Sequence, residues 1–107
     1  MDNKGIYVSK QVQGTKISVQ TKNSTYKIEV LDTEGEVRVI GGLFEVSSVA
    51  RFNGSTFGGT MLKMDWIGKD MHMEFQDDER IYTTSLVREA TIFGPGWVYT
   101  MGWNNDI

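Results

Sequence analysis

The sequence lacks most of the residues that catalytic and covalent sites require: among 107 residues there is no cysteine, one proline and one histidine. Without cysteine, a disulfide framework, a thiol nucleophile and a cysteine-ligated metal are all excluded. Any Ser-His-acid triad would have to use His72 as its base. The glycines Gly54, Gly58 and Gly59 fit neither the GxGxxG nor the GxxxxGKS/T spacing of phosphate-binding loops. We therefore expect a non-enzymatic protein without a cofactor.

Long apolar runs are also missing. No stretch approaches the roughly 18 apolar residues of a membrane-spanning helix, and the start of the sequence, MDNKGIYVSKQV, lacks the apolar core of a signal peptide. We expect no membrane partner and a cytoplasmic location. The length matches one domain of the commonest size, so we predict a single all-β domain over residues 1–107 with an aromatic, glycine-rich C-terminal tail at 94–107.

What the sequence does contain is alternation of apolar and polar residues, the pattern of half-buried β-strands. Lys16–Lys22 alternates, and a two-residue turn at Asn23-Ser24 would place Val19 opposite Ile28 on a returning strand, Thr25–Asp32. We predict an all-β fold: a single small antiparallel β-barrel or β-sandwich of about seven or eight strands, built from meanders and hairpins, with little or no helix. Barrel and sandwich both stay open, because the choice depends on pairing between strands far apart in the chain.

The middle and the end of the sequence extend this prediction. Glu36–Ile40 predicts a third strand, and Phe44–Phe52, where helical and strand spacing compete, is assigned to a strand because of its β-branched residues and neighbouring strands. Residues 53–59 predict a glycine-rich loop. Ile81–Phe93 predicts a long strand that is interrupted near Thr84-Ser85 by a bulge or a short turn.

The segment Met61–Gln76, MLKMDWIGKDMHMEFQ, predicts a hairpin with a two-residue turn at Gly68-Lys69. Counting outward from that turn gives these facing pairs: Trp66 with Met71, Met64 with Met73, Asp65 with His72, and Lys63 with Glu74. Each pair is chemically matched, and matched cross-strand pairs stabilise a sheet. The histidine is therefore expected in a solvated cross-strand pair rather than in a catalytic dyad.

One face of this predicted hairpin carries soft ligands, namely Met64, Met71 and Met73 beside Trp66. Thioethers select Cu(I) or Ag(I), and an indole face shields such a cation. The spacing W-x4-M-x-M-x-F resembles the W-x2-M-x-M-x-F stretch of the small periplasmic copper and silver chaperones, which are also β-barrels. The resemblance implies a small-ligand or soft-metal carrier as an alternative function. Those proteins add a histidine from a neighbouring strand, whereas His72 is predicted on the opposite face, and methionine also fills apolar cores without any metal.

Aromatic residues concentrate near the end of the sequence, which holds two of the three tryptophans. Such side chains either cover a core or meet a partner. As the principal function we predict a non-enzymatic binding or protein–protein interaction module whose partner is another protein or a second copy, since open β-edges invite pairing. The residues expected to bind are Trp97, Tyr99, Trp103, Asn53 and Phe57. Compact proteins of this size and composition are common in phages and mobile elements. On this association alone we expect such an origin.

Charge is distributed unevenly. The net charge of −3 argues against nucleic acid as the main partner. Residues 1–27 nevertheless carry five lysines against Asp2, whereas the remainder is acidic, with a cluster at Asp77-Asp78-Glu79. The third alternative is therefore a weak nucleic-acid binder that uses an N-terminal lysine strip, Lys16, Lys22 and Lys27, with Tyr7. The simpler interpretation is that these lysines solvate outward faces and discourage edge pairing.

Overall fold

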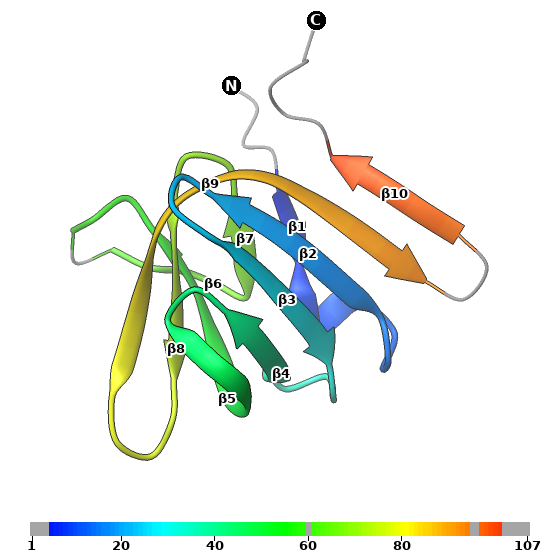
Figure 1. The fold of residues 1–107 in the computed structure, drawn as a ribbon, viewed down its shortest axis with the longest axis horizontal. Coiled ribbons are helices and arrows are strands. Elements are labelled where there is room, and N and C mark those ends of the chain that lie inside the picture. Colours follow the sequence, from blue (N-terminus) through cyan, green and yellow to red (C-terminus); the bar gives the residue numbers. More distant parts are fainter. Residues whose placement is uncertain (1–4, 60, 95–96, 102–107) are drawn as a thin grey trace, which may run out of the picture.

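The computed structural model describes residues 5–59, 61–94 and 97–101, and it is nearly all β (Figure 1). A single turn of 3-10 helix, η1 (Val8–Lys10), follows the first strand. The strands are β1 (Gly5–Tyr7), β2 (Lys16–Thr21), β3 (Thr25–Val30), β4 (Glu36–Gly41), β5 (Phe44–Thr56), β6 (Lys63–Met64), β7 (Trp66–Gly68), β8 (His72–Gln76), β9 (Ile81–Gly94) and β10 (Trp97–Met101). No helix within the described ranges is long and apolar enough to cross a membrane.

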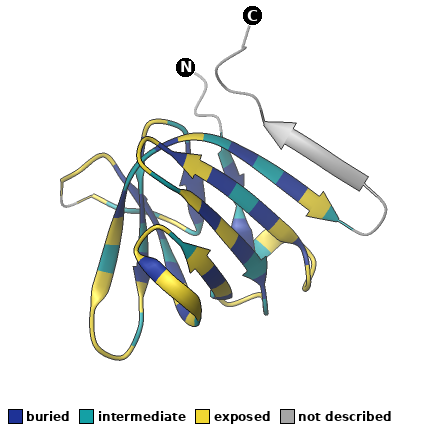
Figure 2. Cartoon of the chain, in the orientation of Figure 1, coloured by how far each residue is buried: buried dark blue, intermediate teal, exposed yellow. Residues whose placement is uncertain are grey.

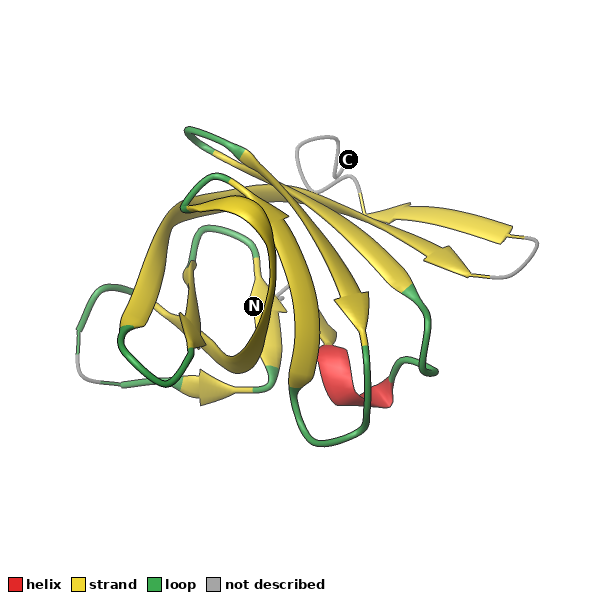
Figure 3. Cartoon of the chain, turned by 60° about the horizontal axis from the view of Figure 1, so that its bottom comes forward, coloured by secondary structure: helices red, strands yellow, loops and turns green. Residues whose placement is uncertain are grey.

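Six strands close into an antiparallel barrel in the order β2-β3-β4-β5-β8-β9 (Figure 3). Closure occurs where β9 returns to β2: Lys16 pairs with Glu29 of β3 on one side and with Phe93 of β9 on the other. In a closed ring each strand has a hydrogen-bonded neighbour on both sides, so the ring has no edge strand. The predicted all-β antiparallel fold is confirmed, and the pairing of β9 with β2 decides for a barrel over a sandwich.

Four further strands are attached to this barrel. The backbone of β10 continues the sheet beyond β9, with Thr100 opposite Thr91. β6 pairs with β5, where Met64 lies opposite Gly54. β1 and β7 form a separate two-stranded sheet, whose Ile6 and Ile67 belong to the same hydrophobic cluster as the barrel interior. The small sheet is therefore part of the packed core.

The core follows directly from the alternation, because buried and exposed residues succeed each other along β2, β3 and β4 (Figure 2). Phe75 packs among aromatic rings, with centroid distances of 5.3 Å to both Phe44 and Phe52 and 6.2 Å to Tyr26. Aromatic pairs of this kind add about 0.5–1.5 kcal/mol each beyond the burial of area. Burial also raises the pKa of the Tyr26 hydroxyl, which accepts the N–H of Leu43 at 3.2 Å.

The β2–β3 hairpin forms with the predicted faces but with a different turn. Val19 lies opposite Tyr26, not Ile28, because the turn is centred on Lys22-Asn23, one residue before the predicted Asn23-Ser24. The N–H of Thr21 donates to the Ser24 carbonyl at 2.8 Å, and the Thr21 hydroxyl accepts the Ser24 N–H at 3.1 Å. These bonds stabilise the turn at its observed position. A shift of two residues keeps every side chain on its face, which is why alternation alone does not detect it.

The predicted hairpin over Met61–Gln76 is wrong. Its first arm divides into β6, which pairs with β5, and β7, which pairs with β1, while its second arm, β8, pairs with β5 and β9. Asp65 and Asp70 both adopt positive φ angles, 65° and 63°, which breaks the extended run at two points. Aspartate is among the few non-glycine residues that tolerate this region. The facing pairs of that hairpin, including Met64 with Met73, are therefore not formed.

Glycine makes the alternative pairing of β7 possible. A Cβ atom on Gly5 would lie 2.2 Å from the Ile67 carbonyl oxygen, and one on Gly68 would lie 2.5 Å from Nε1 of Trp66. No side chain fits at either distance, so the backbones of β1 and β7 can approach each other around the indole only with glycine at these positions.

Register shifts occur at several places in the barrel, and two of them bear on the predictions. The predicted loop at residues 53–59 is wrong at its start, because β5 continues through Thr56 with Asn53 as the extra residue of a bulge opposite β8. The predicted interruption at Thr84-Ser85 is confirmed as a bulge in β9. There the Thr84 hydroxyl accepts the N–H of Met73 at 3.0 Å, which satisfies a backbone donor that the bulge leaves without a ladder partner.

Candidate functional site

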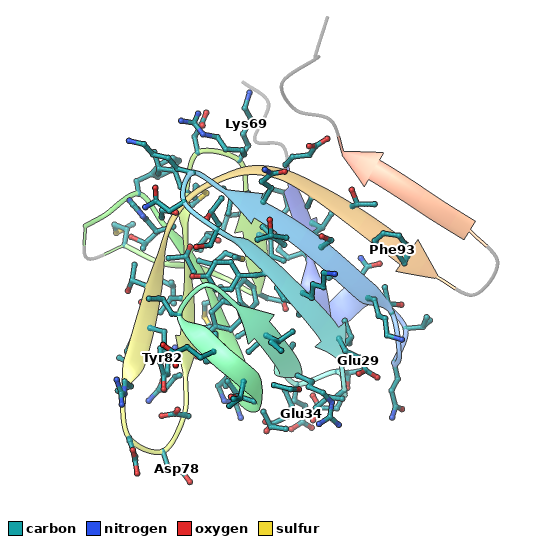
Figure 4. The ribbon with its side chains drawn as sticks, in the orientation of Figure 1. Glu29, Glu34, Lys69, Asp78, Tyr82 and Phe93 are labelled. Atoms are coloured by element: carbon teal, nitrogen blue, oxygen red, sulfur yellow. The ribbon has the colours of Figure 1, made fainter. Side chains whose placement is uncertain are left out.

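A shallow groove of about 460 Å³ lies on the outer face of the barrel, across β9, β2, β3 and β4. Strand register positions its side chains, because outward residues on neighbouring strands stand next to one another. One row runs from Phe93 through Lys16 and Glu29 to Arg38. A second row places Lys27 opposite Ile40. We call these six residues the basic groove (Figure 4 labels Glu29 and Phe93).

The basic groove combines positive charge with apolar surface. It holds three cations and one acid, in a chain whose net charge is −3. Nε of Arg38 lies 3.6 Å from Oε1 of Glu29, and because both side chains are partly exposed this ion pair is weak. Ile40 and Phe93 remain 41% and 40% exposed. Such a surface suits an anionic group that has an apolar neighbour.

A second distinctive surface is the tip between β5 and β6, at the left of Figure 1. Phe57, Met61 and Met64 are the three most exposed large hydrophobic residues in the described ranges, at 72%, 81% and 73%. Phe57 and Met61 belong to the connection between the two strands, and Met64 lies on β6 opposite Gly54. We call these three residues the apolar tip.

The base of the apolar tip is held by hydrogen bonds. The Thr56 hydroxyl accepts the N–H of Gly58 at 3.1 Å and donates to the Gly59 carbonyl oxygen at 3.4 Å. Ser55 is fully buried, and its hydroxyl donates to the Trp66 carbonyl. The tip therefore presents apolar side chains from an anchored position.

The predicted partner-binding residues have different surroundings. Phe57 lies on the apolar tip, and its role in binding stays a prediction. The amide of Asn53 donates to Glu74 Oε2 at 2.9 Å and Gln76 Oε1 at 3.1 Å, so it is engaged within the protein. The backbone of Trp97 and Tyr99 forms part of β10, but their side chains, and the whole of Trp103, lie outside the described residues.

The soft-metal residues are only partly brought together. Trp66, Met71 and Met73 are buried, whereas Met64 is 73% exposed on β6. The Nζ atom of Lys63 lies 3.9 Å from the centroid of the Trp66 ring, so the protein's own ammonium group occupies the place at which an indole would shield a cation. Among the described residues no group of three or more histidine, cysteine, aspartate or glutamate side chains could hold a metal ion.

The predicted Asp65–His72 pair is wrong, because each residue has a different partner. The Asp65 carboxylate accepts the N–H of Ser9 at 2.9 Å and its hydroxyl at 2.6 Å. Nδ1 of His72 lies 2.7 Å from the Thr84 carbonyl oxygen. A carbonyl can only accept, so Nδ1 carries the proton. This arrangement does not resemble the base of a triad, in which a carboxylate orients the imidazole.

The lysine strip is divided between surfaces. Lys16 and Lys27 meet in the basic groove, but Lys22 lines a separate depression beside Arg88 and Glu89. Tyr7 packs on Trp66 at a centroid distance of 4.8 Å. The predicted lysine strip did not include Arg38, Ile40 and Phe93, because it was based on the charge of residues 1–27 alone. The signal that could have found them is their position among the polar, outward-facing positions of two predicted strands, Glu36–Ile40 and Ile81–Phe93.

Comparison with known proteins adds no relative: no family model, no curated protein and no solved structure matches this chain.

Proposed function

We propose that this chain is a non-enzymatic protein-interaction module that binds a partner protein through the apolar tip. The observation that carries the proposal is that the three most exposed large hydrophobic side chains of the described residues lie at one hairpin, Phe57 and Met61 in the β5–β6 connection and Met64 on β6. Exposed apolar clusters are costly in water and mark interaction sites. Phenylalanine and methionine are also enriched at interfaces.

The anchored base of the tip supports the same function. Because Thr56 and Ser55 fix the backbone where the tip begins, docking requires less ordering than it would for a loose loop. Loops that carry binding residues on a rigid scaffold are common among β-barrels.

Site-specific photo-crosslinking tests this proposal. Phe57 is replaced by a photoreactive benzoyl-phenylalanine, the protein is irradiated in its host cells, and cross-linked peptides are identified by mass spectrometry. The matched control places the same residue at Val46, which is 69% exposed and lies near the opposite end of β5 from the tip. We expect a defined protein adduct at position 57 that is absent at 46, and weaker binding of that partner after Met61→Ser. Identical adduct patterns at the two positions would contradict the proposal.

The non-enzymatic part of the proposal has a separate test. His72→Gln removes the only imidazole of the chain while conserving a hydrogen-bond donor. We expect the variant to retain the partner adduct and the full biological activity of the protein in its host. Loss of activity with an unchanged circular dichroism spectrum and an unchanged adduct would indicate a catalytic role.

A further inference from the structure

The basic groove calls for a negatively charged occupant, and this chain itself carries a segment of matching chemistry. The turn between β8 and β9 contains Asp78 and Glu79, both exposed, followed by Ile81, which is 56% exposed. The two carboxylates match the excess of cations in the groove, and the isoleucine matches its apolar surface at Ile40 and Phe93. Charge complementarity of this kind selects partners and orients them.

The acidic turn is preorganised to present these groups. The Asp77 carboxylate accepts the N–H groups of Glu79 at 2.8 Å and Arg80 at 3.0 Å, and the hydroxyl of Tyr82 at 2.8 Å. The guanidinium of Arg80 lies 5.4 Å from the centroid of the Tyr82 ring, over the strand rather than at the tip of the turn. Asp77 therefore braces the turn internally, and the charge that remains at its tip is that of Asp78 and Glu79.

We infer that the basic groove receives the β8–β9 turn of a second copy of this chain. The groove volume of about 460 Å³ is within the range of 300–1,000 Å³ that is typical of ligand pockets. Lys16, Lys27 and Arg38 would meet the carboxylates of Asp78 and Glu79, while Ile81 would lie against Phe93.

This contact is heterologous, because the groove and the turn are different surfaces of the same molecule. Figure 4 shows Asp78 at the end of the β8–β9 hairpin, apart from Glu29 and Phe93. Once one copy's turn fills the next copy's groove, one groove and one turn remain unfilled at the two ends. Heterologous contacts therefore grow into chains or close into rings. The inference does not rest on the apolar tip, which takes no part in the contact.

A charge-swap experiment by sedimentation velocity tests the inference. The groove variant carries Lys16→Glu and Lys27→Glu, and the turn variant carries Asp78→Lys and Glu79→Lys. Both leave the Asp77 brace intact. The matched control, Lys10→Glu with Lys22→Glu, makes the same change in net charge outside the groove. Circular dichroism checks that each variant folds.

The wild-type protein should associate with increasing concentration, more strongly at about 20 mM salt than at about 0.5 M salt, where exposed charges are screened. The groove variant and the turn variant should each weaken association at least about tenfold, and the control variant should not. Mixing the groove variant with the turn variant should restore association, because each then offers the other a complementary pair of surfaces. The apolar-tip variant Phe57→Ser should associate like the wild type.

Several results would overturn the inference. The wild type could remain monomeric throughout, the groove variant could associate as strongly as the wild type, or the mixture could fail to recover. Loss of association in Phe57→Ser would assign the contact to the apolar tip instead. A fluorescent single-stranded oligonucleotide provides the remaining arm: if the monomeric wild type binds it and the groove variant does not, the occupant of the groove is nucleic acid.

Discussion

The β2–β3 hairpin and the segment Met61–Gln76 present the same kind of sequence pattern and fold in opposite ways. In the first, neighbouring strands pair with each other as expected, and only the turn and, with it, the register differ by a shift that keeps every side chain on its face. In the second, a perfectly matched set of facing residues forms none of its pairs, because β7 joins β1 and β8 joins β5 and β9. Alternation therefore determines which side of a strand is buried but not which strand lies beside it. Partner choice depends on backbone conformations such as those of Asp65 and Asp70.

The largest effect on stability is expected from a substitution of Phe75. It tests whether the segment Met61–Gln76 contributes as much to the core as the β2–β3 hairpin does. Phe75→Ala removes a fully buried ring and should lower the free energy of unfolding by about 3–5 kcal/mol. Val19→Ala in the hairpin removes less buried volume and should cost roughly 2 kcal/mol. Urea titration measures both. A smaller loss for Phe75→Ala than for Val19→Ala would mean that the segment is only loosely attached.

The next effect concerns the partner that replaces the predicted hairpin. Gly5→Ala introduces a methyl group at the β1–β7 contact, where backbone and indole leave no space, and should cost about 1–3 kcal/mol. Gly59→Ala is the matched control, because its Cβ would meet no atom within 4 Å. Denaturation midpoints compare the two variants. Equal stability would argue that β1 and β7 are not tightly paired.

A double-mutant cycle separates the observed partner of Asp65 from the predicted one. Asp65→Ala and Ser9→Ala, alone and combined, should reveal a coupling of about 1 kcal/mol, because the Asp65 carboxylate accepts two hydrogen bonds from Ser9. The corresponding cycle of Asp65→Ala with His72→Gln should be additive to within about 0.5 kcal/mol. Strong coupling between Asp65 and His72 would instead support the predicted hairpin.

The smallest effect belongs to the β8–β9 turn, a local turn braced by its own side chain. Hydrogen bonds from the N–H of Glu79, the Tyr82 hydroxyl and the N–H of Arg80 hold the pKa of Asp77 below its ordinary value, because they favour the ionised form. The hydrogen bond that the Tyr82 hydroxyl donates to Asp77 also raises the pKa of Tyr82, because it favours the protonated hydroxyl.

Because the folded-state pKa of Asp77 is depressed, its contribution to stability is complete above the ordinary aspartate pKa of about 3.9 and is lost as pH falls through the depressed value. The stability difference between the wild type and Asp77→Ala should therefore shrink below about pH 4. Urea titrations at neutral and acid pH measure it. Tyr82→Phe, which removes one of the three donors, should retain part of the acid dependence. A difference that does not change with pH would contradict this account of the turn.

The faces of the strands were predictable from sequence, whereas their neighbours were not. Ile17, Val19 and Val30 are buried as predicted, because period-two alternation reflects the pleat directly. Within β5 the pattern misled, since Val46 is 69% exposed although it alternates with Phe44. The closing pair Lys16–Phe93 brings together residues from opposite ends of the chain, and no local pattern encodes that contact.

The candidate sites follow the same division. The exposure of Phe57 was predictable from its glycine-rich surroundings. The complete basic groove was not, because Phe93 joins Lys16 only when β9 pairs with β2 and the barrel closes, although Arg38 is brought beside Glu29 by consecutive strands. The bulge at Asn53 was equally hidden, because the segment was assigned to a loop, whereas the bulge at Thr84-Ser85 was among the predicted alternatives.

The pairing of the first strands with late ones has a consequence for synthesis on the ribosome. β1 can pair only after β7 has been synthesised, and β2 can pair with β9 only after β9 has been synthesised. At about 5–20 residues per second, that wait lasts seconds, during which the nascent chain holds an open meander instead of a barrel. A trigger for misfolding in the cell would therefore be a pause in translation after β5, when apolar strands are exposed and the strand that closes the ring has not yet been made.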